Sequence, residues 1–188
     1  MIVQFTGLSG AGKTTLAHAV AEKLQQLQIA HLIIDGDVYR KTLCADLGFS
    51  AADRQENVRR LARLSHEKSQ AGAVVLLAVI NPFAAIREQI EKEYGAYTVW
   101  VDCALPTLIS RDTKGLYKRA LLPEGHPDKL HNLTGVNDVY EAPENPHVHL
   151  PTHLHSVDEA AEILFAFICR QLIAAGAMPP ADDNTPLP

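Results

Sequence analysis

The residues with the clearest chemical potential lie near the amino terminus, in the stretch Gly7-Leu8-Ser9-Gly10-Ala11-Gly12-Lys13-Thr14. This stretch follows an expected short buried strand at residues 2–6 and precedes a helical pattern, and it matches the Gly-x-x-x-x-Gly-Lys-Thr arrangement of a phosphate-binding loop (P-loop). Its glycines let successive N–H groups converge on phosphate oxygens, and the following helix presents its positive end to the same anion. Lys13 would reach the β- and γ-phosphates of a nucleotide, and the Thr14 hydroxyl would ligate the bridging Mg²⁺. The pattern therefore predicts nucleotide binding rather than a simple connecting turn.

A second group of chemical interest is the acidic pair in Asp35-Gly36-Asp37, which follows the expected strand at residues 31–35. Ligands of doubly wound α/β folds bind at the carboxyl edge of the sheet, so both carboxylates should lie beside the P-loop. One acid could hold Mg²⁺ through water, and the other could orient or deprotonate an acceptor hydroxyl. The alternative is that Asp37 only caps the start of a helix.

A P-loop alone does not distinguish a switch GTPase, a motor ATPase and a small-molecule kinase. Asp112-Thr113-Lys114-Gly115 fits the short Asp-x-x-Gly pattern of a GTPase, but the chain contains no Asn-Lys-x-Asp motif for reading guanine. The sequence therefore disfavours a GTPase switch.

The elements that must position these residues alternate between strand and helix, which is typical of an α/β fold. The run at 73–80 is apolar throughout, as expected of a central parallel strand covered on both faces. We expect a P-loop NTPase-type three-layer sandwich with a five-stranded parallel sheet. Strands are expected at 2–6, 31–35, 73–80, 97–102 and 147–150. Helices are expected from the P-loop to about 28, at 37–46, 50–71 and 83–94, after Pro106, and from the Ser156-Val157-Asp158-Glu159 capping box to about 172.

Composition places the chain among single-domain soluble proteins of the cytoplasm. It has 188 residues, 47% hydrophobic and 21% charged, and a net charge of −5 that disfavours nucleic-acid binding. Its longest apolar run, residues 71–80, is too short for a membrane span, and no secretory signal pattern is present. Three widely spaced cysteines, without a Cys-x-x-Cys pair, argue against disulfides. We expect one kinase domain at 1–175, a mobile lid at 113–145 where periodicity is lost, and a disordered tail at 176–188.

Further motifs extend along residues 2–172. They are Asp46-Leu47-Gly48-Phe49-Ser50, Asp53-Arg54, Glu56-Asn57-Val58-Arg59-Arg60, Arg111-Asp112, Lys114-Gly115-Leu116-Tyr117-Lys118 and Tyr140-Glu141-Ala142-Pro143-Glu144-Asn145. In this order, together with the P-loop and the acidic pair, they resemble the adenylylsulfate kinases (APS kinases). That family phosphorylates the 3′-hydroxyl of adenosine 5′-phosphosulfate with ATP. The resemblance implies ATP and Mg²⁺ as cofactors, adenosine 5′-phosphosulfate as substrate, a homodimer and a possible sulfurylase partner.

The resemblance also implies roles for individual residues. Asp37 would act on the 3′-hydroxyl, Arg54 and Asn57 would bind the phosphosulfate and nucleotide, and lid cations such as Lys114, Lys118 and Arg119 would close over both nucleotides. Phe49 would stack on the acceptor adenine, with a core position as the alternative, and Arg54 could instead be merely solvated. The expected catalytic residues are Lys13, Asp37 and Asn81, and the expected metal ligands are Thr14 and Asp35. The expected ATP-binding residues are Gly7, Leu8, Ser9, Gly10, Ala11, Gly12, Lys13, Thr14, Thr15 and Arg111. The expected substrate-binding residues are Asp37, Arg40, Phe49, Arg54, Asn57, Ile80, Asn81, Lys114, His131 and Leu133.

Departures from the family pattern keep two other functions open. Val38 replaces an Asn, and His131 replaces a Lys. Asn81 replaces a serine that is phosphorylated in some members, so direct in-line transfer is implied. Leu133 replaces one of two aromatic rings expected around the acceptor adenine, and the lid segment 121–129 is longer than usual. The alternatives are a kinase of another small hydroxylated anion, or a catalytically silent nucleotide-binding regulator, which the retained Lys13 and Asp37 disfavour.

Four histidines near the carboxyl end, at positions 147, 149, 153 and 155, suggest a zinc site at first sight. No cysteine accompanies them, and Pro151 interrupts the run. We therefore expect a histidine-rich surface edge rather than a metal centre.

Overall fold

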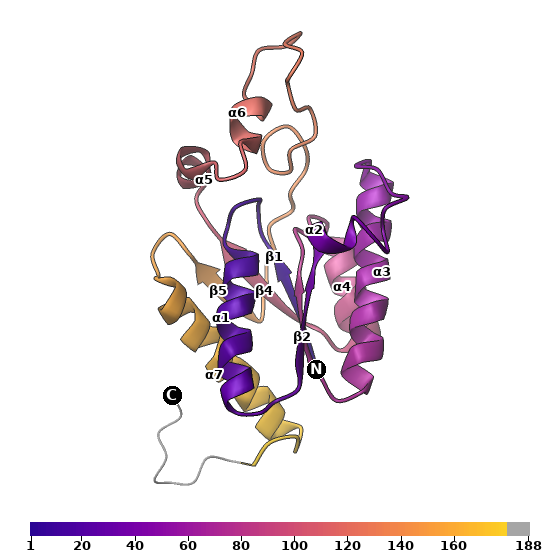
Figure 1. The fold of residues 1–188 in the computed structure, drawn as a ribbon, viewed down its shortest axis with the longest axis vertical. Coiled ribbons are helices and arrows are strands. Elements are labelled where there is room, and N and C mark those ends of the chain that lie inside the picture. Colours follow the sequence, from indigo (N-terminus) through magenta and orange to yellow (C-terminus); the bar gives the residue numbers. More distant parts are fainter. Residues whose placement is uncertain (180–188) are drawn as a thin grey trace.

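In the computed structural model, which describes residues 1–179, five parallel strands form one sheet in the order β2-β3-β1-β4-β5 (Figure 1). The strands are β1 (Ile2–Thr6), β2 (His31–Asp35), β3 (Val74–Ala78), β4 (Tyr97–Asp102) and β5 (Val148–Pro151). Every neighbouring pair is parallel, which confirms the predicted sheet. The carboxyl ends of all five strands therefore meet at one edge, where the P-loop, the acidic pair and the lid emerge.

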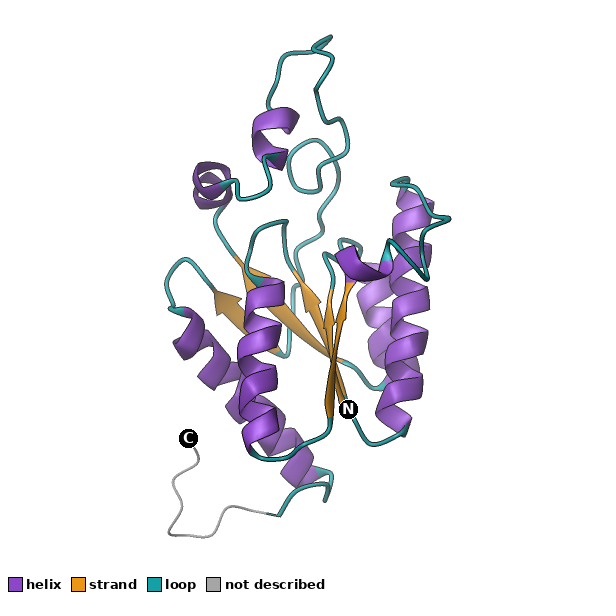
Figure 2. Cartoon of the chain, in the orientation of Figure 1, coloured by secondary structure: helices purple, strands orange, loops and turns teal. Residues whose placement is uncertain are grey.

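Helices cover both faces of this sheet and complete three layers (Figure 2). The longer helices are α1 (Lys13–Gln26), α3 (Ala51–Gln70), α4 (Ala84–Tyr94) and α7 (Val157–Ala174); the shorter ones are α2 (Gly36–Tyr39), α5 (Leu105–Arg111) and α6 (Leu116–Ala120). Helices α1 and α7 pack together on one face, and α3 and α4 on the other. Val74 and Leu76 join the core under α1 and α7, whereas Val75 and Leu77 join the core under α3 and α4. Two buried faces explain why β3 is apolar at every position.

The helix predicted at residues 37–46 is much shorter than expected. Helix α2 spans only Gly36–Tyr39, and turns follow it to residue 46. Arg40 bends back to donate to the Gly48 carbonyl at 2.7 Å, which closes these turns onto themselves. The alternative role of Asp37 as a helix cap is also wrong, because Asp35 is the N-cap and accepts from the Asp37 N–H at 2.8 Å.

The last helix begins at the predicted capping box. Ser156 Oγ accepts from the Glu159 N–H at 3.2 Å, and a Glu159 carboxylate oxygen accepts from the Ser156 N–H at 2.8 Å. We expect Ser156→Ala to lower the stability by about 1 kcal/mol, because one amide of the first turn loses its partner. Calorimetry should show a fall in Tm of about 2–4 °C for a chain of this size. Ser110→Ala on the exposed side of α5 is the control, and an equal Tm for both variants would contradict the capping role.

The predicted lid at 113–145 forms an irregular excursion above the carboxyl edge of the sheet and contains α6 (Figure 1). Its extra segment at 121–129 folds back on α6, since Lys129 Nζ donates to the carbonyls of Ala120 and Leu122. Residues 176–178 close α7 with a turn in which the Ala177 N–H donates to the Leu172 carbonyl. The rest of the predicted tail, from residue 180, lies outside the described residues. None of the helices between residues 1 and 179 has both the length and the apolar character needed to cross a membrane.

Candidate active site

The P-loop connects β1 to α1 with a backbone that only glycine accommodates at two positions. Gly7 has φ 151°, and a Cβ there would lie 2.2 Å from the Val101 carbonyl oxygen. Gly12 has φ 102° and forms the N-cap of α1, whose first turn contains Lys13 and Thr14. This strained turn places the start of α1 at the carboxyl edge of the sheet, facing the cavity described below.

Lys13 is held inside the loop that it is expected to serve. Its Nζ donates to the carbonyls of Gly7 and Leu8, each at 2.8 Å. Burial, with Lys114 nearby as a second cause, lowers the pKa of Lys13 to about 8. Nucleotide phosphates would stabilise the charged ammonium, because they would bring negative charge close to a buried cation.

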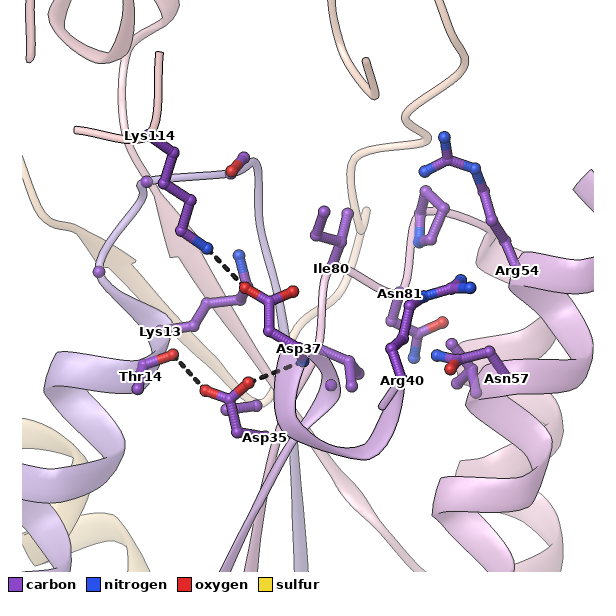
Figure 3. A pocket seen from close by; sticks show the side chains of 18 of the residues that line it. Lys13, Thr14, Asp35, Asp37, Arg40, Arg54, Asn57, Ile80, Asn81 and Lys114 are labelled. Atoms are coloured by element: carbon purple, nitrogen blue, oxygen red, sulfur yellow. Dashed lines mark hydrogen bonds and ion pairs between the residues drawn. The ribbon is translucent and has the colours of Figure 1, made fainter. Parts of the chain in front are cut away.

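Thr14 and Asp35 come together as expected of residues that hold Mg²⁺. Thr14 Oγ1 donates to Asp35 Oδ2 at 2.6 Å, and Asp35 Oδ1 accepts from the Asp37 N–H (Figure 3). A hydroxyl and a carboxylate are the hard oxygen donors that Mg²⁺ prefers, and its remaining positions are usually filled by water and phosphate oxygens. The donor set therefore fits Mg²⁺ bound together with a nucleotide.

Asp37 faces the same cavity from the start of α2, and its carboxylate is paired with a lysine of the lid. Lys114 Nζ donates to Asp37 Oδ2 at 2.6 Å (Figure 3). The side chains are 52% and 76% exposed, respectively, so a ligand can compete for both. The lid thus supplies a cation to the residue expected to act on the acceptor hydroxyl.

The opposite side of the cavity is basic and aromatic. The Phe49 side chain is 56% exposed, so a core position is excluded. The guanidinium carbons of Arg40 and Arg54 lie 4.6 Å and 5.7 Å from the centre of its ring. These three residues could bind an anionic ligand that also carries an aromatic base.

Arg54 is tied to the lid instead of being solvated. It donates to Thr134 Oγ1 at 2.9 Å and to the Asn132 carbonyl, and it pairs with Asp138 at 3.1 Å. The alternative that Arg54 is merely solvated is therefore wrong. Its guanidinium links α3 to the segment that carries the predicted residues His131 and Leu133.

Most predicted site residues line one cavity of about 560 Å³. They are Ser9, Gly10, Gly12, Lys13, Thr14, Thr15, Asp35, Asp37, Arg40, Phe49, Arg54, Asn57, Ile80, Asn81 and Lys114. Arg111 borders a small hollow beside Ser9 and Gly10, next to the P-loop. Seven further residues line the cavity but were not predicted as site residues: Gly36, Lys41, Val58, Ala78, Val79, Pro82 and Thr113. Thr113 could have been found because it directly precedes Lys114, whereas Lys41 and Val79 carried no motif.

Two predicted substrate-binding residues do not line this cavity. Leu133 is 5% exposed and belongs to the hydrophobic cluster that also contains Leu108, Tyr117 and Ala120. The His131 side chain is 64% exposed, with Nδ1 3.8 Å from a Glu124 carboxylate oxygen. Neither side chain takes the place of the aromatic ring or the lysine that the family pattern would supply at the acceptor.

Asn81 reaches the cavity wall but directs its side chain toward the sheet. It has φ 43° and is 1% exposed. Its Nδ2 donates to Gln4 Oε1 at 3.0 Å, and its Oδ1 has no hydrogen-bond partner among the described residues. This geometry suits a part of the wall better than a group that contacts the transferred phosphoryl.

The histidine-rich edge makes local contacts. His149 stacks on Trp100 with ring centres 4.3 Å apart, and its Nε2 lies 3.0 Å from Asp102 Oδ2. His147 Nδ1 accepts from the Thr98 N–H at 3.1 Å. Within residues 1–179, no three histidine, cysteine or acidic side chains are grouped to hold a metal ion.

A parallel sheet with a P-loop after β1, an acidic pair after β2 and a cavity between the loop and α3 defines a P-loop kinase. Comparison with known proteins shows which family of P-loop kinases the chain resembles. The family model described as Adenylylsulphate kinase matches residues 1–151. An adenylyl-sulfate kinase of Citrobacter koseri is 47% identical over 152 residues, covering 79% of this chain and 73% of the relative. Another, from Picosynechococcus sp., is 42% identical over 161 residues, covering 85% and 88%.

A solved structure agrees with these relatives. The Mycobacterium tuberculosis APS kinase, in complex with AMPPNP and APS, superposes with a TM-score of 0.82 at 37% identity. The superposition covers 89% of this chain and 96% of that one. The chain belongs to the adenylylsulfate kinase family.

Proposed function

We propose that this protein transfers the γ-phosphoryl group of ATP to the 3′-hydroxyl of adenosine 5′-phosphosulfate, giving 3′-phosphoadenosine 5′-phosphosulfate and ADP. One observation carries the proposal: a single cavity joins the P-loop and the acidic pair to the basic and aromatic group of Arg40, Phe49 and Arg54. The first side suits Mg·ATP, and the second suits an acceptor with both a base and anionic groups. Family membership supports the same pairing of substrates.

The residues divide the chemistry between them. Lys13 would leave the Gly7 and Leu8 carbonyls and donate to the transferring phosphoryl group, where charge builds up in the transition state. Asp37 would orient the acceptor hydroxyl and take its proton as the 3′-oxygen bonds to phosphorus and the bond to the β–γ bridging oxygen breaks. Mg²⁺, held by Thr14 and through water by Asp35, would neutralise phosphate charge.

The asparagine at position 81 favours direct transfer of the phosphoryl group from ATP to the acceptor. Asparagine has no hydroxyl to carry a phosphoryl group, and the Asn81 amide is engaged with Gln4. The 3′-hydroxyl would therefore attack the γ-phosphorus in line, without a phosphoenzyme intermediate.

A second candidate acceptor is another small hydroxylated anion. The observation that favours it is that residue 133 is a leucine and is buried away from the cavity. It therefore supplies no second ring opposite Phe49. Stacking on one base contributes about 1–3 kcal/mol, so selection for adenine could be weaker here. A silent regulatory role is disfavoured by the arrangement of Lys13, Thr14, Asp35 and Asp37 around one cavity.

We also propose that the protein acts as a cytoplasmic homodimer, with a sulfurylase supplying its acceptor. The support for both proposals is the resemblance to the adenylylsulfate kinase family. Size-exclusion chromatography with light scattering would measure the molar mass in solution. The mass of a monomer at the concentration used in the activity assay would contradict the homodimer.

The test of function is the release of ADP from Mg·ATP, with and without adenosine 5′-phosphosulfate, over acceptor concentrations from below micromolar to millimolar. We expect strong stimulation at low concentration, with 3′-phosphoadenosine 5′-phosphosulfate as the second product. If ATP binds but this acceptor does not stimulate release, a panel of hydroxylated anions would identify the second candidate.

A further inference from the structure

Arg87 carries a buried guanidinium that the phosphoryl transfer described above does not use. It lies near the start of α4 and is 3% exposed. Its Nη1 donates to the Asn81 carbonyl oxygen at 2.8 Å, and its Nη2 donates to the Glu141 carbonyl oxygen at 2.6 Å. Burial lowers the pKa of Arg87, since the charge is removed from water. The guanidinium thus donates one hydrogen bond to each of two different segments of the chain.

The first of these segments is the cavity wall at the end of β3. Asn81 has φ 43°, a left-handed backbone that non-glycine residues rarely adopt. The surroundings must hold such a conformation in place. They do so through its carbonyl oxygen, which also accepts from Thr6 Oγ1 at 3.0 Å, and through its amide on Gln4.

The second segment is the end of the lid. The Glu141 N–H donates to the Pro82 carbonyl at 2.9 Å, and a Glu141 carboxylate oxygen accepts from the Ala84 N–H at 2.6 Å. The Tyr140 hydroxyl forms a hydrogen bond with Thr6 Oγ1 at 3.1 Å. The lid therefore returns to the sheet directly behind the wall that contains Asn81.

The beginning of the lid is attached on the nucleotide side. Lys114 pairs with Asp37, and the Tyr117 hydroxyl donates to the Ser9 carbonyl of the P-loop at 2.7 Å. The two ends of the lid thus bind opposite sides of the cavity. Arg87 is the side chain that connects the far end of the lid, at Glu141, to the carbonyl of Asn81, beside the direct contacts of Glu141 with Pro82 and Ala84.

We propose that Arg87 is a positioning residue that holds the end of the lid against residue 81 and so fixes the acceptor side of the cavity. An apolar side chain of similar volume would fill the same space without a buried charge. The guanidinium contributes two hydrogen bonds of fixed direction, which an apolar side chain cannot supply. The kinetic test of this role rests on the proposed function, and a second test does not.

The kinetic test compares Arg87→Met with Arg63→Met, the same change at an exposed arginine of α3. We expect Arg87→Met to raise the KM for adenosine 5′-phosphosulfate about tenfold or more, because the wall and the lid end lose their common support. The Kd for Mg·ATP and the behaviour of Arg63→Met should stay within about twofold of the unmodified protein. Arg87→Lys, which keeps the charge but not the planar fork of donors that reaches both carbonyls, should give an intermediate KM.

The second test is hydrogen exchange on the protein without ligands, which remains valid if the acceptor proves to be a different anion. Arg87→Met should speed exchange in peptides covering residues 136–142 and 81–84, and should leave P-loop peptides unchanged. If the variant fails to fold, Tyr140→Phe should produce a smaller change in the same peptides. Unaltered exchange, or a lower Tm with unaltered KM and exchange, would overturn the proposal.

Discussion

Replacing Lys13 with alanine should lower kcat by about 10²–10³-fold while the protein stays folded. The Lys13 ammonium would donate to the transferring phosphoryl group in the proposed complex, and one donor aimed at developing charge contributes about 10²–10³-fold. In the structure, the Lys13 ammonium donates to the Gly7 and Leu8 carbonyls, which belong to the P-loop itself. Removing the side chain therefore breaks no long-range contact. Steady-state ADP release and circular dichroism would measure the two effects.

Lys68→Ala, an exposed change in the last turn of α3, is the matched control for Lys13→Ala. It should leave kcat unchanged. A Lys13→Ala variant with full turnover would exclude the P-loop lysine from phosphoryl transfer. A variant with a native spectrum and lost turnover would agree with the proposed role.

Replacing Asp37 with asparagine should lower kcat by about 10²–10⁴-fold, with little change in the Kd for Mg·ATP. Asparagine keeps the size of the side chain but cannot take a proton from the acceptor hydroxyl. It also loses the charge that attracts Lys114, whose Nζ lies 2.6 Å from Asp37 Oδ2. Single-turnover measurements at saturating ATP would separate this loss from weaker acceptor binding.

Asp35→Asn provides the contrast for Asp37→Asn, because the two acids have different neighbours. Asp35 accepts from Thr14 Oγ1 and lies on the metal side. Its loss should raise the Mg²⁺ concentration needed for half-maximal activity, whereas Asp37→Asn should not. If both variants respond equally to added Mg²⁺, the division of roles between the acids is wrong.

The sequence predicted the sheet well because the relevant signals are local. The apolar run that contains β3 and the Ser156 capping box are each complete within a few residues, so both can be recognised without knowing the rest of the fold. Helix α2 was predicted too long because the Arg40 hydrogen bond to Gly48 depends on how the chain turns, which helical periodicity does not encode.

Site residues were predictable where a motif fixed both their type and their place in the chain. The P-loop and the acidic pair both lie at the cavity. The partners of Arg54 could not be predicted, since Thr134 lies 80 residues away and is brought near only by the path of the lid. Leu133 shows the same limit, because an apolar lid residue can face either a ligand or the core, and here it faces the core.

Lys129 closes the lid segment after α6 by local contacts alone. Its Nζ binds carbonyls of Ala120 and Leu122 and pairs with Glu124, all within nine residues of the chain. The polar partners of Lys129 lie within the segment and at the end of α6. A change in the length of the segment therefore adds only a small loop-closure entropy. Such a change should leave the sheet and the P-loop undisturbed.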